Sequence, residues 1–327
     1  MHVLVTGGAG FIGSHLIRKL RSQNHDVDAI DNHSAGEASI RREKEIEKDK
    51  KVEVWRIDVK DTRNYVLKML KKRKNIDVNS PIPPVDAIVH LAAPISVEES
   101  MREPAKYCKE IHGKTIALLE AAKDENVKKV VLASTAAVYG NPDKVPIAED
   151  EKTSPLSPYA ISKLAADEIA RMYAREYGLE TVILRLFNVY GPDQDPASPY
   201  IGFIAKCFQR ARKNEPFIIF GDGNQTRDFV YVEDVVDAII SALTKAVEPG
   251  SVINIGSGKQ TRIIDVAHKI AEITSIPLEI KYEPARKGDL LYSQANISKA
   301  EKILGYEPKF TLEQGLSNIW AWYKNHK

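Results

Sequence analysis

The chain has 327 residues, 43% of them hydrophobic and 28% charged, an ordinary globular composition that supports a large core without disulfides or structural metal. Its net charge of +2 argues against a nucleic-acid-binding or membrane-surface protein. No targeting segment is visible, and no stretch approaches the ~18 apolar residues of a membrane helix, so we expect a cytoplasmic protein. Cys108 and Cys207 have no partners at metal-ligand spacing, and we expect two buried or half-buried thiols and no metal site.

In chain order, short β-branched segments alternate with helical patterns. The expected strands are mostly apolar throughout, which is typical of parallel strands covered on both faces: His2–Thr6, Asp26–Ile30, Val52–Ile57, Asp86–Ala92, Lys129–Ser134 and Leu179–Leu186. The helices expected between them are Gly13–Gln23, a segment after Asp61, Pro104–Glu125 and Ser157–Tyr177. This alternation predicts an α/β fold with a Rossmann-type doubly wound parallel sheet.

The second half of the chain is less regular. It contains an expected helix near Ile201–Lys213, an apolar helix followed by the strand Ser251–Ile255, and a final aromatic helix through Trp320 and Tyr323. We therefore expect a dinucleotide-binding domain of residues 1–185, to which residues 230–255 return, and a smaller interleaved substrate domain of residues 186–327. The charged run Arg41–Lys51 and the connection Lys71–Pro84 are expected to be solvated surface.

A glycine-rich loop follows the first expected strand directly and opens the first helix. Gly8, Gly10 and Gly13 satisfy the spacing Gly-x-Gly-x-x-Gly, and Gly7 extends the pattern. Glycines allow a tight turn and a close approach of the backbone to a pyrophosphate, which then faces the helix N-terminus. Asp31 ends the second strand, where a carboxylate accepts hydrogen bonds from a ribose 2′-hydroxyl and repels a 2′-phosphate. The sequence therefore favours NAD over NADP.

Tyr159 and Lys163 stand four residues apart at the start of an expected helix, with Ser157 and Pro158 as its N-cap and first position. This spacing places both side chains on one helix face, where an ammonium group favours the phenolate of the tyrosine and lowers its pKa. The strand that precedes this helix ends near Thr135, and hydroxyl groups at that end would face the ligand crevice of an open α/β sheet.

With these features the chain resembles the extended short-chain dehydrogenase/reductase family, and within it the UDP-glucose (UDP-galactose) 4-epimerases. The motifs that carry this resemblance span the chain: Thr6–Gly13, Asp58-Val59, His90–Ala93, Ser134–Gly140, Tyr159 with Lys163, Arg185–Pro192, Gly221–Gly223 with Arg227-Asp228, and Arg286-x-Gly288-Asp289.

The resemblance implies roles for individual residues. Tyr159 would be the catalytic base, Lys163 would bind the nicotinamide ribose and tune Tyr159, and Thr135 would hydrogen-bond the reacting sugar oxygen. The residues implied in NAD binding, besides Tyr159 and Lys163, are Gly7, Gly10, Phe11, Ile12, Gly13, Asp31, Asn32, Asp58, Val59, Leu91, Ala92, Ala93 and Ser134. The residues implied in substrate binding, besides Thr135, are Asn188, Phe220, Arg227, Arg286, Asp289 and Ser293.

One motif departs from the family pattern. The helix before the fifth strand usually carries Asn-x-x-Gly-Thr, whereas this chain reads Glu110-Ile111-His112-Gly113-Lys114-Thr115. The cofactor contact of the missing Asn is therefore in doubt. We expect His112 on this helix to be a packed or exposed side chain and not a catalytic group.

The resemblance implies an NAD-dependent epimerase that interconverts UDP-glucose and UDP-galactose through a transient 4-keto intermediate. Ser293, four residues after Asp289, would leave room in the sugar pocket for an N-acetyl group, although Tyr292 is adjacent. A 4,6-dehydratase is disfavoured because Ala136 and Ala137 stand where such enzymes carry an Asp-Glu pair. A UDP-glucuronate epimerase or decarboxylase, and a non-catalytic NAD-binding regulator, remain as alternatives.

The resemblance also implies a homodimer, in which the helices Pro104–Glu125 and Ser157–Tyr177 pair with their symmetry mates in a four-helix bundle. An apolar stripe on the second of these helices fits such an interface, and also fits an intramolecular core: Ile161, Leu164, Ile169 and Met172.

Overall fold

The computed structural model describes residues 1–34, 36–61, 85–194, 202–285 and 290–325. It divides into two compact units. Unit 1 comprises Met1–Thr135, Ser157–Leu184 and Ile239–Val252, and unit 2 comprises Ala136–Leu156, Arg185–Ala238 and Ile253–Lys327. The chain therefore passes between the units several times, and residues 136–156 cluster with unit 2.

A seven-stranded sheet with the order β11-β6-β5-β4-β1-β2-β3 organises the first part of the chain. Its strands are β1 (His2–Thr6), β2 (Asp26–Ile30), β3 (Val52–Trp55), β4 (Ala87–His90), β5 (Lys129–Thr135), β6 (Glu180–Leu186) and β11 (Ser251–Ile255). The pairs from β3 to β5 are parallel. The predicted doubly wound sheet is confirmed, and its strand order reverses between β1 and β4, the position where open α/β sheets bind ligands.

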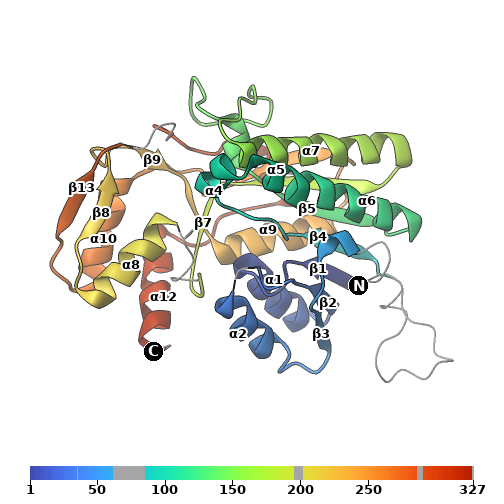
Figure 1. Ribbon diagram of the computed structural model, residues 1–327, viewed down its shortest axis with the longest axis horizontal. Helices are drawn as coiled ribbons and strands as arrows, with labels where there is room; N and C mark the ends of the chain where they lie inside the picture. Colours follow the sequence, from blue (N-terminus) through green and yellow to red (C-terminus); the bar gives the residue numbers. More distant parts are fainter. Residues whose placement is uncertain (35, 62–84, 195–201, 286–289, 326–327) are drawn as a thin grey trace. The chain divides into compact units, whose positions relative to one another are not determined.

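Helices lie on both faces of this sheet (Figure 1). α1 (Phe11–Ser22) and α2 (Glu37–Ile46) lie on one face, and α6 (Lys114–Asp124) and α7 (Pro158–Tyr177) run side by side on the other. Two short helices, α4 (Val97–Arg102) and α5 (Pro104–Tyr107), precede α6. Between the sheet and α6 and α7 lies the hydrophobic core of unit 1, which includes Leu4, Ile88, Leu118, Val130 and Ile183.

The helix predicted over Pro104–Glu125 is interrupted. A π-helical segment, Cys108–Gly113, separates α5 from α6 and covers the motif in which the chain departs from the family pattern. π-Helical turns are uncommon and occur frequently at functional sites. The thiol of Cys108 accepts a hydrogen bond from Ser162 of α7 at 3.6 Å, and Cys108 itself is exposed, whereas we expected it to be at least half-buried.

α7 begins and ends as its sequence indicates. The Ser157 side chain accepts a hydrogen bond from the backbone N–H of Ala160, and Pro158 occupies the first helical position. Gly178 ends the helix in the left-handed conformation that glycine adopts without strain. The predicted cap is therefore confirmed, and it sets the position of Tyr159 in the first turn.

The charged run in α2 is not wholly solvated, in contrast to our prediction. Arg42 and Glu43 are both buried. Arg42 donates to the carbonyl oxygen of Ala9, while Glu43 accepts from Arg56 at 2.8 Å and pairs with His33. Charge runs are usually solvated because burial of a lone charge is costly, and here the nearby partners offset that cost.

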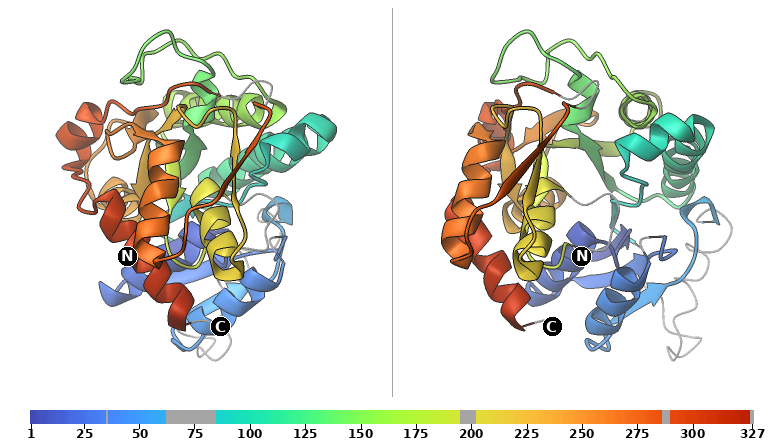
Figure 2. Two further views of the ribbon diagram at one scale, coloured as in Figure 1. Left: turned by 90° about the vertical axis from the view of Figure 1, so that its left-hand side faces the viewer. Right: turned by 60° about the vertical axis from the view of Figure 1, so that its left-hand side comes forward.

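Unit 2 has a core of its own. Its helices α8 (Phe203–Lys213), α10 (Ile263–Thr274) and α12 (Leu312–Asn325) pack beside one another (Figure 2) around buried aromatic side chains such as Phe208 and Tyr323. Three two-stranded sheets complete it: β7 (Asn188–Tyr190) with β10 (Phe229–Tyr231), β9 (Thr226–Arg227) with β12 (Thr261–Arg262), and β8 (Phe217–Phe220) with β13 (Ile280–Glu283). α11 (Ser298–Leu304) also belongs to unit 2, whereas α9 (Val232–Thr244) begins in unit 2 and ends in unit 1.

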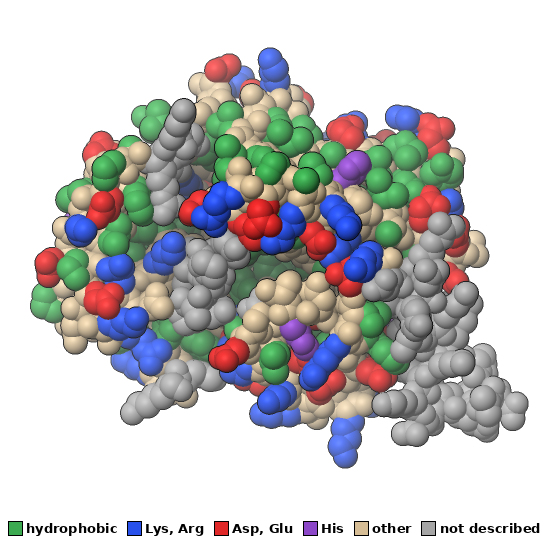
Figure 3. Space-filling view, viewed as in Figure 1, with side chains coloured by type: hydrophobic (Ala, Val, Ile, Leu, Met, Phe, Trp, Pro, Cys, Tyr) green, Lys and Arg blue, Asp and Glu red, His purple; other side chains and the backbone are tan. Residues whose placement is uncertain are grey.

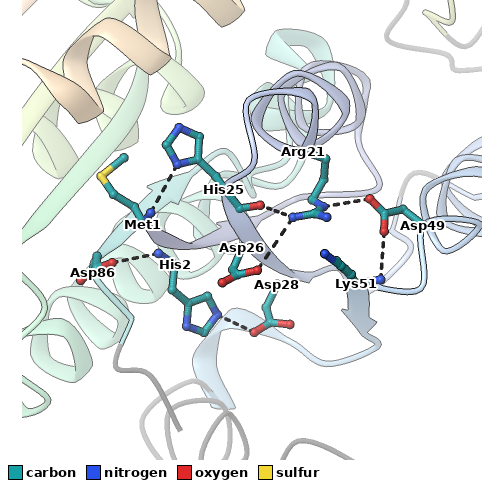
Figure 4. A network of polar contacts seen from close by, with 9 residues as sticks. All are labelled: Met1, His2, Arg21, His25, Asp26, Asp28, Asp49, Lys51 and Asp86. Atoms are coloured by element: carbon teal, nitrogen blue, oxygen red, sulfur yellow. Dashed lines mark hydrogen bonds and ion pairs between the residues drawn. The ribbon is translucent and has the colours of Figure 1, made fainter.

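The amino ends of β1 and β2 carry a polar network (Figure 4). The His2 backbone N–H donates to Asp86 at 2.9 Å, and the His2 ring contacts the buried Asp28 at 2.7 Å. Arg21, near the end of α1, donates to Asp49 at 2.8 Å. These contacts tie α1 and β1 to neighbouring loops at the end of the sheet opposite the glycine loop, so we assign them a structural role.

The surface in Figure 3 shows Lys and Arg side chains interspersed with Asp and Glu side chains, as the small net charge suggests. Among the helices of the described ranges, none is both long and apolar enough to cross a membrane. Nor do the His, Cys, Asp and Glu side chains of these ranges gather into a group of three or more that could hold a metal ion.

Candidate active site

The glycine loop between β1 and α1 is packed so closely that side chains would not fit. A Cβ on Gly7, whose φ is +72°, would lie 2.9 Å from the backbone nitrogen of Ala92, in the loop after β4. A Cβ on Gly13 would collide with the Gly7 carbonyl oxygen. α1, described over its whole length, has neither a side-chain cap nor an acidic residue in its first turn. The Gly10 backbone N–H donates to the Gly7 carbonyl oxygen at 3.0 Å and closes the turn. The N–H groups of Phe11 and Ile12 in the first turn of α1 are left for a ligand, and the loop fits a pyrophosphate.

Asp31 is held in a fixed orientation beside this loop. One carboxylate oxygen accepts the backbone N–H of Ala9 at 3.0 Å, and the other accepts that of His33 at 2.8 Å. Arg42 donates to the carbonyl oxygen of Ala9 at 3.3 Å, so the backbone N–H and the carbonyl group of this loop residue are both held by hydrogen bonds. Burial raises the pKa of Asp31, and the hydrogen bonds and the nearby cationic side chains lower it in part. A carboxylate fixed at the end of β2 fits the predicted ribose contact.

Asp58 and Asn32 lie together at the carboxyl ends of β3 and β2. The Asn32 side chain donates to Asp58 Oδ2 at 3.2 Å, and the Lys60 backbone N–H donates to Asp58 Oδ1 at 3.0 Å. The side chain of Val59 is buried in the core of unit 1. The structure thus brings together these predicted cofactor residues.

The loop after β4 is tied to β1. The backbone N–H of Leu91 donates to the carbonyl oxygen of Thr6 at 3.1 Å, and that of Ala92 lies 3.4 Å from the Thr6 hydroxyl oxygen. Leu91, Ala92 and Ala93 are all half-buried. These three predicted cofactor residues therefore lie beside the glycine loop.

His90 is a buried residue of this region to which we assigned no role of its own. Thr115 donates its hydroxyl proton to the Ile111 carbonyl at 2.8 Å, so its oxygen accepts from His90 Nε2 at 3.2 Å. Nδ1 of His90 then accepts from the Thr6 hydroxyl at 2.7 Å. This arrangement requires a neutral imidazole with its proton on Nε2. Burial, with Lys163 and Lys114 nearby, lowers the pKa of His90 from 6.5 to about 3.

This neutral histidine predicts an acid sensitivity of folding. Unfolded His90 binds a proton below its ordinary pKa of 6.5 and the folded residue does not until about 3, so stability falls as the pH drops through this window. Between about pH 7.5 and 5.5 the contribution is about 1.4 kcal/mol, which should be absent in His90→Asn. Urea unfolding at both pH values measures it, and the exposed His268→Asn is the control. Equal pH dependence in wild type and His90→Asn would contradict this.

Thr135, Tyr159 and Lys163 converge at the carboxyl end of β5. Tyr159 and Thr135 are joined by a side-chain hydrogen bond. Lys163, one turn further along α7, donates from Nζ to the carbonyl oxygen of Ala133 at 2.8 Å. Tyr159 and Lys163 are both buried, and the ring of Tyr107 packs edge-on against Tyr159. The three predicted catalytic residues are therefore assembled on one side of the sheet.

The protonation of this set differs from our expectation. Burial raises the pKa of Tyr159 to about 12, although the hydrogen bond with Thr135 lowers it in part. Burial also lowers the pKa of Lys163 to about 8. The expected lowering of the tyrosine pKa by Lys163 is thus wrong, because removal from water disfavours the charged form of both groups.

Ser134, adjacent to Thr135, has a hydroxyl that is buried and has no hydrogen-bond partner among the residues that the structure describes. Buried polar groups are nearly always paired, and an exception indicates a ligand, a water or a functional role. Together with the glycine loop and the fixed Asp31, this hydroxyl fits a site in which a bound dinucleotide supplies the missing partner.

The substrate residues expected after Thr135 belong to unit 2. Asn188 is exposed, and its backbone N–H donates to the carbonyl oxygen of Asp228 at 3.0 Å. Phe220 and Arg227 are half-buried, and the Arg227 guanidinium donates to the Leu290 carbonyl at 2.7 Å. Arg286 and Asp289 lie outside the described residues.

Ser293 and its neighbour Tyr292 are clearly distinguished by their exposure. Ser293 is 3% exposed and its backbone N–H lies 3.4 Å from the Thr226 hydroxyl, whereas Tyr292 is 57% exposed. The buried Asp228 accepts from Ser257, Gly258 and Ala295 in the same part of unit 2. Serine is therefore the residue of this pair that faces inward.

Other residues with specific contacts were missed from the sequence: Ala9, Arg42, His90, Lys114, Thr115 and Asp228. Their partners lie far along the chain, so no local spacing could have revealed them. All of them except Arg42 lay in motifs quoted for the family resemblance or its departure, which was the available signal.

A Rossmann-type sheet, a glycine loop at the strand-order reversal and a Thr-Tyr-Lys set whose Tyr159 and Lys163 are buried define a dinucleotide-dependent enzyme of the short-chain dehydrogenase/reductase type. The family model described as "NAD dependent epimerase/dehydratase family" matches residues 3–256. The chain is 35% identical over 326 residues to a UDP-glucose 4-epimerase from Mycolicibacterium smegmatis, a match that covers 99% of each chain.

Two solved structures are similar along their whole length. One is a UDP-N-acetylglucosamine 4-epimerase from Methanobrevibacter ruminantium in complex with UDP-N-acetylmuramic acid, with a TM-score of 0.89, 32% identity and coverage of 100% of this chain and 99% of that chain. The other is a UDP-glucuronic acid 4-epimerase from Bacillus cereus in complex with UDP-glucuronic acid and NAD, with a TM-score of 0.89, 30% identity and coverage of 100% of both chains. The chain belongs to the NAD-dependent epimerase/dehydratase family, and it is an epimerase with NAD as its cofactor.

Proposed function

We propose that this enzyme is a UDP-sugar 4-epimerase that interconverts UDP-glucose and UDP-galactose, and also the N-acetylated pair. The observation that carries the proposal is that the half-buried Thr135 is hydrogen-bonded to the buried Tyr159, with the buried Lys163 one turn away. Its relatives include 4-epimerases of UDP-glucose, UDP-N-acetylglucosamine and UDP-glucuronic acid, which supports a UDP-sugar as the class of substrate. The particular sugar is then determined by the residues of the sugar pocket.

In this proposal, Tyr159 accepts the proton of the sugar 4-hydroxyl and later returns it, because its phenol oxygen is the proton acceptor of the set. Thr135 hydrogen-bonds the same oxygen and orients it. Lys163, anchored by the Ala133 carbonyl, supplies a positive charge near the phenol when protonated. NAD would be held by the glycine loop, Asp31 and Lys163, and when bound it would supply the acceptor and donor of the 4-hydride and a positive charge that favours the Tyr159 phenolate.

The same residues disfavour the other reactions of the family. A dehydratase needs an acid and a base beyond the tyrosine, and Ala136 and Ala137 follow Thr135 directly. A non-catalytic regulator would have no use for the assembled Thr-Tyr-Lys set. A UDP-glucuronate epimerase or decarboxylase uses the same set, so the assay must include that substrate.

The test is a product analysis of purified protein with UDP-glucose, UDP-N-acetylglucosamine and UDP-glucuronate, followed by NMR. We expect the C4 epimers of the first two, with no net accumulation of NADH, because the cofactor is regenerated in each turnover. Release of carbon dioxide, loss of water, or a C4 epimer from UDP-glucuronate alone would contradict the proposed substrates.

The inward-facing Ser293 predicts tolerance of a 2-acetamido group. In Ser293→Tyr a phenol ring would fill space that serine leaves open, so we expect kcat/KM for the acetamido sugars to fall about tenfold or more while that for UDP-glucose changes little. Tyr292→Ser, a substitution of the exposed neighbour, is the matched control, and it should not change kcat/KM for UDP-glucose or for the acetamido sugars. A wild-type enzyme that does not turn over the acetamido sugars, or a Ser293→Tyr variant with unchanged kcat/KM for them, would contradict the pocket assignment.

We propose further that the enzyme is a homodimer. Exposed apolar side chains gather on α7 and near the adjoining α4: Ile95, Val97, Met101 and Ile161. Of the predicted stripe, Ile169 and Met172 pack instead against the core of unit 1. Light scattering at micromolar concentration should give twice the mass of 36.5 kDa, and Ile161→Glu should shift the protein toward monomer. A monomeric wild type would contradict the dimer.

A further inference from the structure

Lys114 is a nearly buried lysine at the first position of α6, directly after the π-helical segment. Its Nζ donates to Asp58 Oδ2 at 2.7 Å and forms a second ion pair with Glu110, one turn earlier. Desolvation lowers the pKa of Lys114, but the hydrogen bonds to the two carboxylates raise it more. Lys114 is therefore a cation throughout the neutral range, with two carboxylate partners.

The contact of Lys114 with Asp58 connects three segments of the chain: the loops after β2 and β3 and the start of α6. Asp58 follows β3, and its Oδ2 also accepts from Asn32, which follows β2. Its Oδ1 accepts from the backbone N–H of Lys60. The contact with Lys114 adds the start of α6 to this cluster. In open α/β sheets, the carboxyl ends of strands at these positions flank the adenosine half of a dinucleotide.

The departure from the family motif coincides with this cluster. The segment Glu110–Thr115, which departs from Asn-x-x-Gly-Thr, contains both Glu110 and Lys114. These two residues form one ion pair, spaced i, i+4 along the helix. The cation of this pair reaches Asp58, the carboxylate that the resemblance assigns to the adenine.

We infer that Lys114 is a positioning residue of the NAD site, which holds the Asp58 carboxylate and, through Asn32, the loops on either side of the adenosine. This inference rests on the proposed placement of NAD. It assigns to the ion pairs of Lys114 with Asp58 and Glu110 the support of this side of the NAD site. Outer contacts of this kind orient the groups that touch the ligand.

The test is the dissociation constant of NAD and of ADP-ribose, measured by calorimetry on protein freed of nucleotide. Lys114→Met should raise both constants about tenfold, and Lys114→Arg should restore them to within about threefold, because a guanidinium keeps the pair. Lys123→Met is the matched control, since Lys123 lies on the same helix but its described partners are Glu120, Asp124 and the ring of Tyr177, not Asp58. It should leave NAD affinity unchanged.

A double variant separates positioning from general damage. If Lys114 acts through Asp58, then Lys114→Met in the Asp58→Asn background should weaken NAD binding by less than twofold further. UDP binding and the urea midpoint report on folding, and they are measured for Lys114→Met and for Lys114→Gln, whose side chain keeps a donor and is one atom shorter. NAD affinity of Lys114→Met within twofold of wild type, or an equal loss of UDP affinity, would overturn the inference. A wild type that binds no NAD would instead contradict the proposed site, and the inference with it.

Discussion

Replacement of Tyr159 by Phe is expected to lower kcat by about a thousandfold or more while NAD stays bound. The substitution removes one oxygen, and this oxygen is the hydrogen-bond partner of Thr135 and the proposed proton acceptor. General acid–base catalysis contributes about 10²–10⁴-fold in enzymes, and the tyrosine is the one base of the proposed set. The ring itself remains, so its edge-on packing against Tyr107 is kept and the fold should be unaffected.

The measurement is turnover of UDP-glucose together with the NAD content of the purified variant. Tyr177→Phe is the matched control, because Tyr177 ends the same helix and is exposed. It should retain full activity. Retention of a tenth of the wild-type kcat in Tyr159→Phe would rule out its assignment as the base, and a loss of bound NAD would show that the variant tests binding and not proton transfer.

Substitution of Gly13 by Ala is expected to weaken NAD binding by about a hundredfold or more. An added Cβ would collide with the carbonyl oxygen of Gly7 and lie 2.9 Å from the Cα of Gly8. Both neighbours are backbone, so the loop itself must move, and its free N–H groups would no longer point at the pyrophosphate. The loss should be seen in the affinity for NAD and in the affinity for ADP-ribose alike.

Gly113→Ala provides the matched control for this substitution. Gly113 also lies in a helical stretch, but a Cβ there would meet nothing within 4 Å. Since alanine is the better helix former by about 1 kcal/mol, this control should be as stable as wild type or more so, with unchanged NAD affinity. NAD binding by Gly13→Ala within threefold of wild type would mean that the loop does not approach the cofactor.

Local sequence patterns predicted much of the fold. Strands β1, β2 and β11 occupy the predicted residues, because apolar β-branched segments next to glycine or acidic turns have few alternatives. The cap of α7 was equally predictable, since Ser157 and Pro158 act on backbone groups within one turn. The sequence also indicated the glycine loop, the carboxylate at the end of β2 and the Tyr-Lys pair, whose spacing is itself the chemical signal.

Only the tertiary structure decided which charged residues are buried and which residues they contact. The burial of Arg42 and Glu43, the tautomer of His90 and the pair of Lys114 with Asp58 each depend on groups more than ten residues away. The pKa of Tyr159 could not be judged from the adjacent lysine, because desolvation depends on how the whole unit packs around the phenol. Spacing along the chain determines neighbours within a helix or turn, whereas burial and long-range pairing arise only when distant segments pack together.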